Sequence, residues 1–193
     1  MNTTDQRPGI QRLASSYYSK LLPPALFLAI VVVLAGIKAG IGLAGVAVLL
    51  LAIALVPGLI YKRSKSLFLK RGIADHWRTN LVAVLMFLGA VICYLIPVNA
   101  PVPATVAALF VGNAGLIFFR RWLNVSAHVS VISFSVLWII ANFGGGWAWL
   151  LVLSPMMLFS RVSLGEHTWR EALSGALLGL ATFCCYLVAT TWS

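Results

Sequence analysis

The chain has 193 residues, of which 61% are hydrophobic and 9% are charged, and its mean hydropathy is +0.98. Soluble domains average about 45–50% apolar and about 25% charged residues, so this composition excludes an ordinary soluble enzyme and predicts a membrane protein. The net charge of +10 does not indicate a nucleic-acid-binding surface, because the basic residues fall in short gaps between apolar runs.

Seven apolar runs follow one another along the chain. A transmembrane helix needs about 20 apolar residues, and fewer where it is short or partly buried in a bundle. The runs cover residues 22–37, 41–61, 81–96, 102–119, 128–143, 147–159 and 172–192. Because the sixth run is short, we expect an all-α fold, a polytopic transmembrane helical bundle of about six to seven spans.

Residues 1–21 form a polar N-terminal segment, and residues 22–193 are expected to form a single transmembrane domain. A polar segment before an apolar run also resembles a signal peptide. Here the first run leads almost directly into the second, which favours a hairpin of two retained helices.

The cysteines and the small residues within the apolar runs are expected to have structural roles. The three cysteines lie in apolar runs without metal-ligand spacing, so we expect small buried hydrophobic residues. Small residues in two of the runs permit close helix approach, either within the bundle or between chains. They are Gly40, Gly42 and Gly45, and Ser174, Gly175 and Gly179.

The basic residues favour one side of the predicted bundle. With seven spans, the N-terminal segment and the second, fourth and sixth connections share a side, and they hold every Lys and Arg except Lys38. By the positive-inside rule this side is cytoplasmic.

The connections on the same side also hold all three histidines and the three acidic residues beyond Asp5. These residues are Asp75, His76, His128, Glu166, His167 and Glu171. Ionisable groups near a membrane are costly to desolvate, so their convergence on one face predicts a functional site. A single interfacial His or Arg is more often a head-group anchor than a catalytic residue. The spacing of these residues therefore has to distinguish a functional site from a set of anchors.

His167 and Glu171 are four residues apart at the start of the last run. If the last helix begins near His167, the two side chains share one face and the carboxylate accepts from one imidazole nitrogen. The other nitrogen then keeps its lone pair exposed, as a nucleophile or general base requires. The alternative is that Glu171 only complements the helix dipole.

Two further segments hold groups suited to phosphate. Ser126 and His128 begin a span, where unpaired backbone N–H groups bind anions; a simple N-cap is the alternative for Ser126. Arg71 and Arg78 precede the third span, and arginine makes bidentate contacts to phosphate oxygens. A basic loop beside a membrane is also common as a topology anchor or a head-group patch.

These three segments resemble the signature motifs of the type 2 phosphatidic acid phosphatase superfamily of integral membrane lipid phosphatases, which read Lys-x6-Arg-Pro, Pro-Ser-Gly-His and Ser-Arg-x5-His-x3-Asp. The third is the closest, since SRVSLGEHTWRE places Ser160, Arg161, His167 and Glu171 at the spacing of that motif. The run SLGEHTWREALSGALLG also resembles the prokaryotic branch of the family. The likeness covers residues 71–179.

Several positions depart from the family motifs. Arg71 and Thr79 stand where the first motif has Lys and Pro. Val125 and Ala127 stand where the second has Pro and Gly, and Ala127 adds a methyl group where phosphate would approach closely. Glu171 replaces Asp and is one methylene longer, so its bond to the histidine requires a different rotamer.

The resemblance implies hydrolysis of a lipid phosphomonoester or diphosphate, of phospholipid or prenyl type, through a phosphohistidine, with no metal and no cofactor. His167, oriented by Glu171, would be the nucleophile, and His128 the general acid and base. The phosphate would be bound by Arg71, Arg78, Ser126, Ala127 and Arg161. Further candidates are Lys70, Asp75 and His76.

The expected partners are the lipid phosphate and the bilayer, without nucleic acid. The expected location is the inner (plasma) membrane of a bacterium or archaeon, with the site on the cytoplasmic face. A non-catalytic member of the same fold, which binds lipid phosphate or serves as a scaffold, is the alternative. A small transporter predicts ionisable residues in mid-span, where the polar residues are Asn113, Asn142, Ser and Thr.

Overall fold

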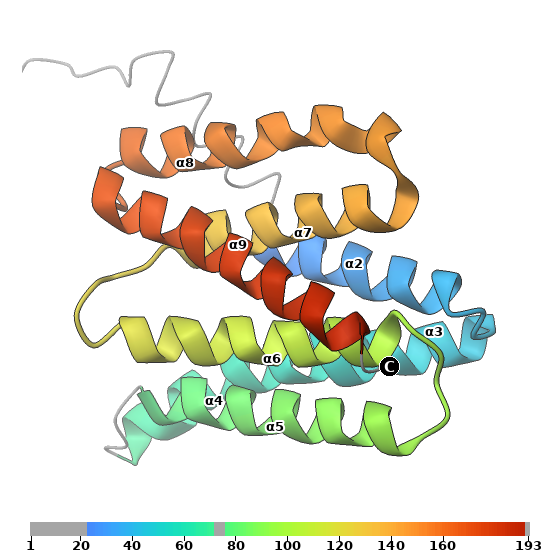
Figure 1. Cartoon of the computed structure of the whole chain (residues 1–193). Coiled ribbons are helices and arrows are strands. Elements are labelled where there is room, and N and C mark those ends of the chain that lie inside the picture. The colour runs from blue at the N-terminus through green and yellow to red at the C-terminus, as the bar shows by residue number, and fades with distance from the viewer. Residues whose placement is uncertain (1–22, 72–75, 192–193) are drawn as a thin grey trace, which may run out of the picture.

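The computed structural model describes residues 23–71 and 76–191, which are helical between short connections (Figure 1). In chain order the elements are α2 (Pro24–Lys38), α3 (Leu43–Leu50), the π-helical segment η1 (Leu51–Leu55), α4 (Val56–Lys70), α5 (His76–Leu95), α6 (Val102–Phe119), α7 (Ala127–Phe143), the 3-10 helix η2 (Gly145–Val152), α8 (Leu153–Ser163) and α9 (Trp169–Thr190). The described residues contain no strand, so the all-α prediction is confirmed.

Four helical segments are long and apolar enough to cross a membrane. They are Leu43–Phe68, Val102–Phe119, Gly145–Ser163 and Trp169–Thr190. Shorter apolar helices accompany them at Pro24–Lys38, Thr79–Leu95 and Ala127–Phe143. The chain is therefore a helical membrane protein, and the total of six to seven spans stays a prediction.

Two helix boundaries differ from the sequence prediction. The helix expected over residues 41–61 continues to Lys70, because the added residues include no Gly or Pro and several good helix formers. The last helix begins at Trp169 rather than near His167, because Thr168 caps its N-terminus.

The ends of the described helices gather at two ends of the bundle. Figure 1 shows the end of α4, the start of α5 and the α6–α7 and α8–α9 connections at one end, which we call the charged end, and the α2–α3, α5–α6 and α7–η2 connections at the other. Exposed tryptophans mark both ends: Trp77, Trp122 and Trp169 at the charged end, and Trp147 and Trp149 at the opposite end. Tryptophan is enriched at membrane–water interfaces, so these residues bound an apolar layer between them.

α9 packs against α7 more extensively than any other pair of helices in the described residues. A Cβ built on Gly175 would lie 2.6 Å from the backbone oxygen of Ser126, and one built on Gly179 would lie 2.8 Å from Ser133 Cβ. Because there is no room for a side chain, the two helices approach to backbone contact. These two small residues of α9 therefore act within the bundle, as in other small-xxx-small contacts between membrane helices.

Two cysteines of α9 are exposed. Cys184 and Cys185 lie on the surface of the bundle, so the expectation of buried cysteines is wrong for both of them. It is confirmed for Cys93 of α5. A thiol behaves as a small hydrophobic group, so exposure on a membrane-embedded helix is compatible with its chemistry.

Polar groups at the opposite end of the bundle are paired with one another. Asn142 Nδ2 donates to the Tyr186 hydroxyl at 2.9 Å, and Lys38 Nζ donates to the backbone oxygen of Asn142 at 2.6 Å. Trp138 Nε1 donates to Thr105 Oγ1 at 2.9 Å. Asn142 is thus part of a structural network that ties α2, α7 and α9 together.

Replacing Gly179 with Ala would press a methyl group against α7. We expect the free energy of unfolding to fall by about 1–3 kcal/mol, the usual cost of overpacking. Gly58→Ala in α4 is the matched control, because nothing lies within 4 Å of the added methyl group. Thermal unfolding in detergent measures both variants, and equal midpoints would contradict the backbone contact.

Candidate active site

The connection between α8 and α9 is a tight turn that carries the third motif. The backbone oxygen of Arg161 accepts hydrogen bonds from the N–H groups of Glu166 at 3.2 Å and His167 at 3.3 Å. Gly165 has a φ of 71°, which residues with a Cβ rarely adopt. The turn directs His167 inward, and its side chain is only 11% exposed.

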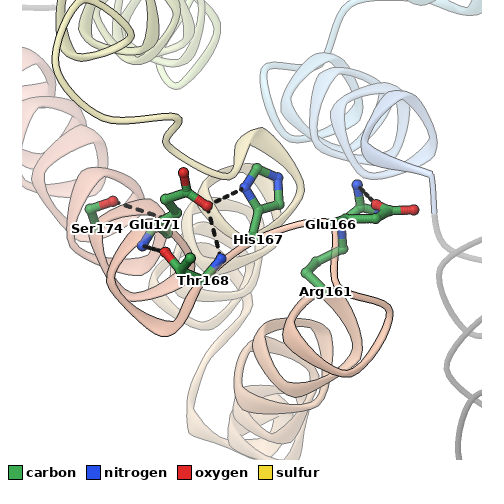
Figure 2. A network of polar contacts seen from close by, with 6 residues as sticks. All are labelled: Arg161, Glu166, His167, Thr168, Glu171 and Ser174. Atoms are coloured by element: carbon green, nitrogen blue, oxygen red, sulfur yellow. Dashed lines mark hydrogen bonds and ion pairs between the residues drawn. The ribbon is translucent and has the colours of Figure 1, made fainter.

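Thr168 and Glu171 cap the start of α9 (Figure 2). The Glu171 backbone N–H donates to Thr168 Oγ1 at 3.3 Å, and the Thr168 backbone N–H donates to Glu171 Oε2 at 2.8 Å. This reciprocal arrangement is a capping box. The sequence prediction missed the role of Thr168, although the Thr-x-x-Glu spacing indicates it.

Glu171 also faces His167, as the spacing predicted. Its Oε2 atom lies 3.5 Å from His167 Nδ1, which is longer than the usual N–H···O distance of about 2.9–3.0 Å. His167 Nδ1 is buried and makes no hydrogen bond to the described residues. The other ring nitrogen, Nε2, points away from Glu171 in Figure 2. The carboxylate oxygen nearest the imidazole is therefore the one that also caps the helix.

Ser126 joins the start of α7 to this turn. Its backbone N–H donates to the backbone oxygen of Glu171 at 3.2 Å. The residue occupies the N-cap position of α7, yet its side chain makes no capping hydrogen bond. Ser126 Oγ is buried and has no hydrogen-bond partner among the described residues. A buried hydroxyl without a partner is costly, and the oxygen of a bound ligand would supply one.

Charged groups from α7 and α8 meet beside these residues. His128, the second residue of α7, is half-buried and interacts electrostatically with Arg161 and His167. Arg161, in the last turn of α8, has a side chain that is 11% exposed and forms an ion pair with Glu166 (Figure 2). The second and third motifs thus come together at the charged end, although they are separated by α7 and α8 in the sequence.

The first motif lies in a different part of the charged end. Arg71 is exposed just after α4, which packs on η1 and α5. Figure 1 shows the α4–α5 hairpin across α6 from α8 and from the start of α9. The structure therefore does not bring Arg71 to His167, and the exposed Lys70 shares its position. Asp75 lies outside the described residues, as do the side chains of His76 and Arg78.

Two further arginines lie on the connection that leads to Ser126. Arg120 and Arg121 follow α6 and line a cavity of about 290 Å³ together with Thr79 and Asn80 of α5. The sequence prediction used these arginines only for topology. The sequence feature that could have indicated a role at the site is the pair of adjacent cations shortly before the second motif.

Comparison of the chain with protein-family models, with curated proteins and with solved structures found no match. The likeness to the type 2 phosphatidic acid phosphatases thus rests on the spacing of the motifs. Within residues 23–71 and 76–191, no group of three or more His, Cys, Asp or Glu side chains is placed to hold a metal ion.

The capping box and the His167 contact can be separated by two substitutions. Thr168→Ala removes a capping acceptor, so we expect the free energy of unfolding to fall by about 1 kcal/mol. Glu171→Gln keeps an acceptor for the Thr168 N–H, since Gln also serves in a capping box, and we expect an unfolding midpoint near that of the wild type. Thermal unfolding in detergent compares the two. A larger loss in Glu171→Gln than in Thr168→Ala would show that the charge, and not the cap, stabilises this turn.

Proposed function

We propose that the protein is a membrane lipid phosphatase that hydrolyses the phosphomonoester or diphosphate of a phospholipid or prenyl lipid through a phosphohistidine intermediate. The observation that carries the proposal is the meeting of His167, His128 and Arg161 beside Ser126 at the charged end. An oriented nucleophile, a second histidine and a cation are the groups that metal-independent phosphoryl transfer requires.

Each histidine has a separate role in the proposed reaction. Glu171 favours the tautomer of His167 with the proton on Nδ1, so Nε2 carries the lone pair that attacks phosphorus. A P–N bond forms as the P–O bond to the lipid breaks, and His128 donates a proton to the departing oxygen. His128 then takes a proton from water, which attacks phosphorus, breaks the P–N bond and releases inorganic phosphate.

The phosphate oxygens would be held by Arg161, by the Ser126 hydroxyl and by N–H groups of the first turn of α7, including that of Ala127. These N–H groups have no intrahelical acceptor and lie at the positive end of the helix dipole. Arg161 would exchange the Glu166 carboxylate for the phosphate, which suits its fork of donors. The remaining candidate cations of the charged end are Arg71, Arg78, Arg120 and Arg121.

The position of the site supports a lipid substrate. Exposed Trp122 and Trp169 flank it at the expected membrane boundary. A lipid lying in the bilayer presents its phosphate at this depth and reaches the helix ends by lateral diffusion.

A non-catalytic role in binding lipid phosphate, or as a scaffold, is the second candidate. The ion pair between Arg161 and Glu166 and the 3.5 Å contact between His167 and Glu171 favour it, because neither group is yet arranged for reaction. A transporter has less support, since Asn142, expected in mid-span, lies near the end of α7 and belongs to a structural network.

Phosphate release from lipid phosphates and diphosphates, measured with purified protein in detergent and EDTA, tests the proposal. We expect release in EDTA, and a loss of about 10³-fold or more in His167→Ala because the nucleophile is gone. His128→Ala should lose about 10²–10⁴-fold, as expected for a general acid and base. Thermal unfolding confirms that each variant is folded. No release from folded wild-type protein would support the binding or scaffold role.

The same assay separates the two roles of Glu171. Glu171→Gln should lower phosphate release by about 10²–10⁴-fold, since the charge that orients and stabilises the imidazolium is lost. Thr168→Ala should retain release at temperatures below its unfolding. The reverse order of activities would exclude Glu171 as the orienting group.

The distribution of Lys and Arg supports a cytoplasmic charged end, in the plasma membrane of a bacterium or archaeon. A cysteine introduced at the exposed Asn124, in a background lacking the native cysteines, reports its side. We expect a membrane-impermeant thiol reagent to label it after lysis and not in intact cells. Labelling in intact cells would place the site on the outer face.

A further inference from the structure

A cavity of about 250 Å³, partly open to the surface of the bundle, lies between α2, the η1–α4 helix, α5, α6, α7 and α9. Most of its wall is apolar. Representative lining residues are Leu28, Ala54, Gly58, Met86, Leu116 and Val131. Ligand pockets for drug-sized molecules measure about 300–1,000 Å³, so this space suits something slimmer, such as one hydrocarbon chain.

The cavity begins one helical turn from the proposed phosphate site. Ser130 lines it and follows Ser126 by four residues in α7, which is about 5–6 Å along the helix axis. Val131 lines it and follows His128 by three residues, so the two lie on neighbouring positions of the same helix face. A molecule with its phosphate at the start of α7 could thus extend directly into this space.

The wall formed by the η1–α4 helix is built from small residues. Ala54, Pro57 and Gly58 line the cavity, and nothing lies within 4 Å of a Cβ added to Gly58. The π-helical segment η1 spans Leu51–Leu55 and contributes Ala54. Single π-helical turns are rare and recur at functional sites.

Two polar side chains in the cavity wall form hydrogen bonds or close contacts with neighbouring groups of the protein. Thr182 Oγ1 donates to the backbone oxygen of Leu178 at 2.8 Å, and Asn113 Nδ2 lies 3.5 Å from Met86 Sδ. No Asp, Glu, Lys, Arg or His is among the described lining residues. The wall can therefore bury the apolar surface of a ligand but has no charged side chain to pair with a phosphate. This excludes the phosphate itself from the cavity and favours a hydrocarbon chain.

We propose that this cavity is the subsite for one hydrocarbon chain of the phosphorylated lipid, with the phosphate of the same molecule at Arg161 and Ser126. The inference rests on the proposed function, because that function places the phosphate at the charged end. Chain and phosphate would then be recognised by separate surfaces one turn apart.

Ala54→Phe fills the cavity, and Ala52→Phe is its matched control, because Ala52 is exposed on the same helix. We expect Ala54→Phe to lower kcat/KM for long-chain phosphatidate by about tenfold or more, the effect of leaving about two methylene groups unburied. Hydrolysis of the soluble ester p-nitrophenyl phosphate should be unchanged in both variants. Equal effects of the two variants on phosphatidate, or an equal loss on both substrates in Ala54→Phe, would overturn the chain subsite.

A measurement that needs no turnover separates this inference from the proposed function. Phosphatidate with a diazirine in its acyl chain is photo-crosslinked to the wild-type protein, and the adducts are mapped by mass spectrometry. We expect adducts on residues 54–61 and 109–116, which Ala54→Phe reduces and Ala52→Phe does not.

Diacylglycerol with the same diazirine chain is the control for unspecific lipid contact. Equal labelling by the two lipids, or no adduct on the cavity wall, would overturn the proposal. Phosphate-dependent adducts without phosphate release from any lipid would keep the chain subsite and reject the phosphatase activity.

Discussion

The close approach of α9 to α7 is the constraint on which the candidate site depends. Because Gly175 and Gly179 have no side chain, the two backbones touch, and the Ser126 N–H reaches the backbone oxygen of Glu171 at 3.2 Å. This bond fixes the start of α7 against the start of α9, and the first turns of both helices face the same space. A bulkier residue at either glycine would push α9 away from α7 and so separate His128 from the α8–α9 turn.

Glu171 connects helix stability to the orientation of the imidazole. One carboxylate oxygen accepts the Thr168 N–H at 2.8 Å and lies 3.5 Å from His167 Nδ1. The same oxygen thus completes the helix cap and lies nearest the imidazole. A capping box uses Glu or Gln at this position, whereas the lipid phosphatase motif that this segment resembles has Asp. The longer side chain thus gives this chain a helix cap together with a carboxylate beside its histidine.

The bilayer separates the chemistry of the molecule into layers. Ionisable groups gather at the charged end, where desolvation is least costly, and the helices below present apolar walls. Arg161 and Ser126 lie at the boundary, one turn above the cavity that Ser130 lines. A phosphorylated lipid, whose phosphate and hydrocarbon chain are directly joined, matches this sequence of a polar site above an apolar cavity. A soluble ester lacks the chain, and a neutral lipid lacks the phosphate.

Hydropathy and charge spacing alone determined the all-α class, the membrane environment and the end at which the ionisable residues gather, because the bilayer imposes length and charge rules that act locally along a chain. The proximity of His167 and Glu171 could also be predicted from the sequence, because the two residues are four positions apart. Only the tertiary structure decided that the Ser126 hydroxyl is buried without a partner among the described residues and that α4, which Arg71 follows, lies across α6 from the start of α9. Packing between distant helices depends on which side chains leave room for which backbones, and no spacing within one segment encodes that choice.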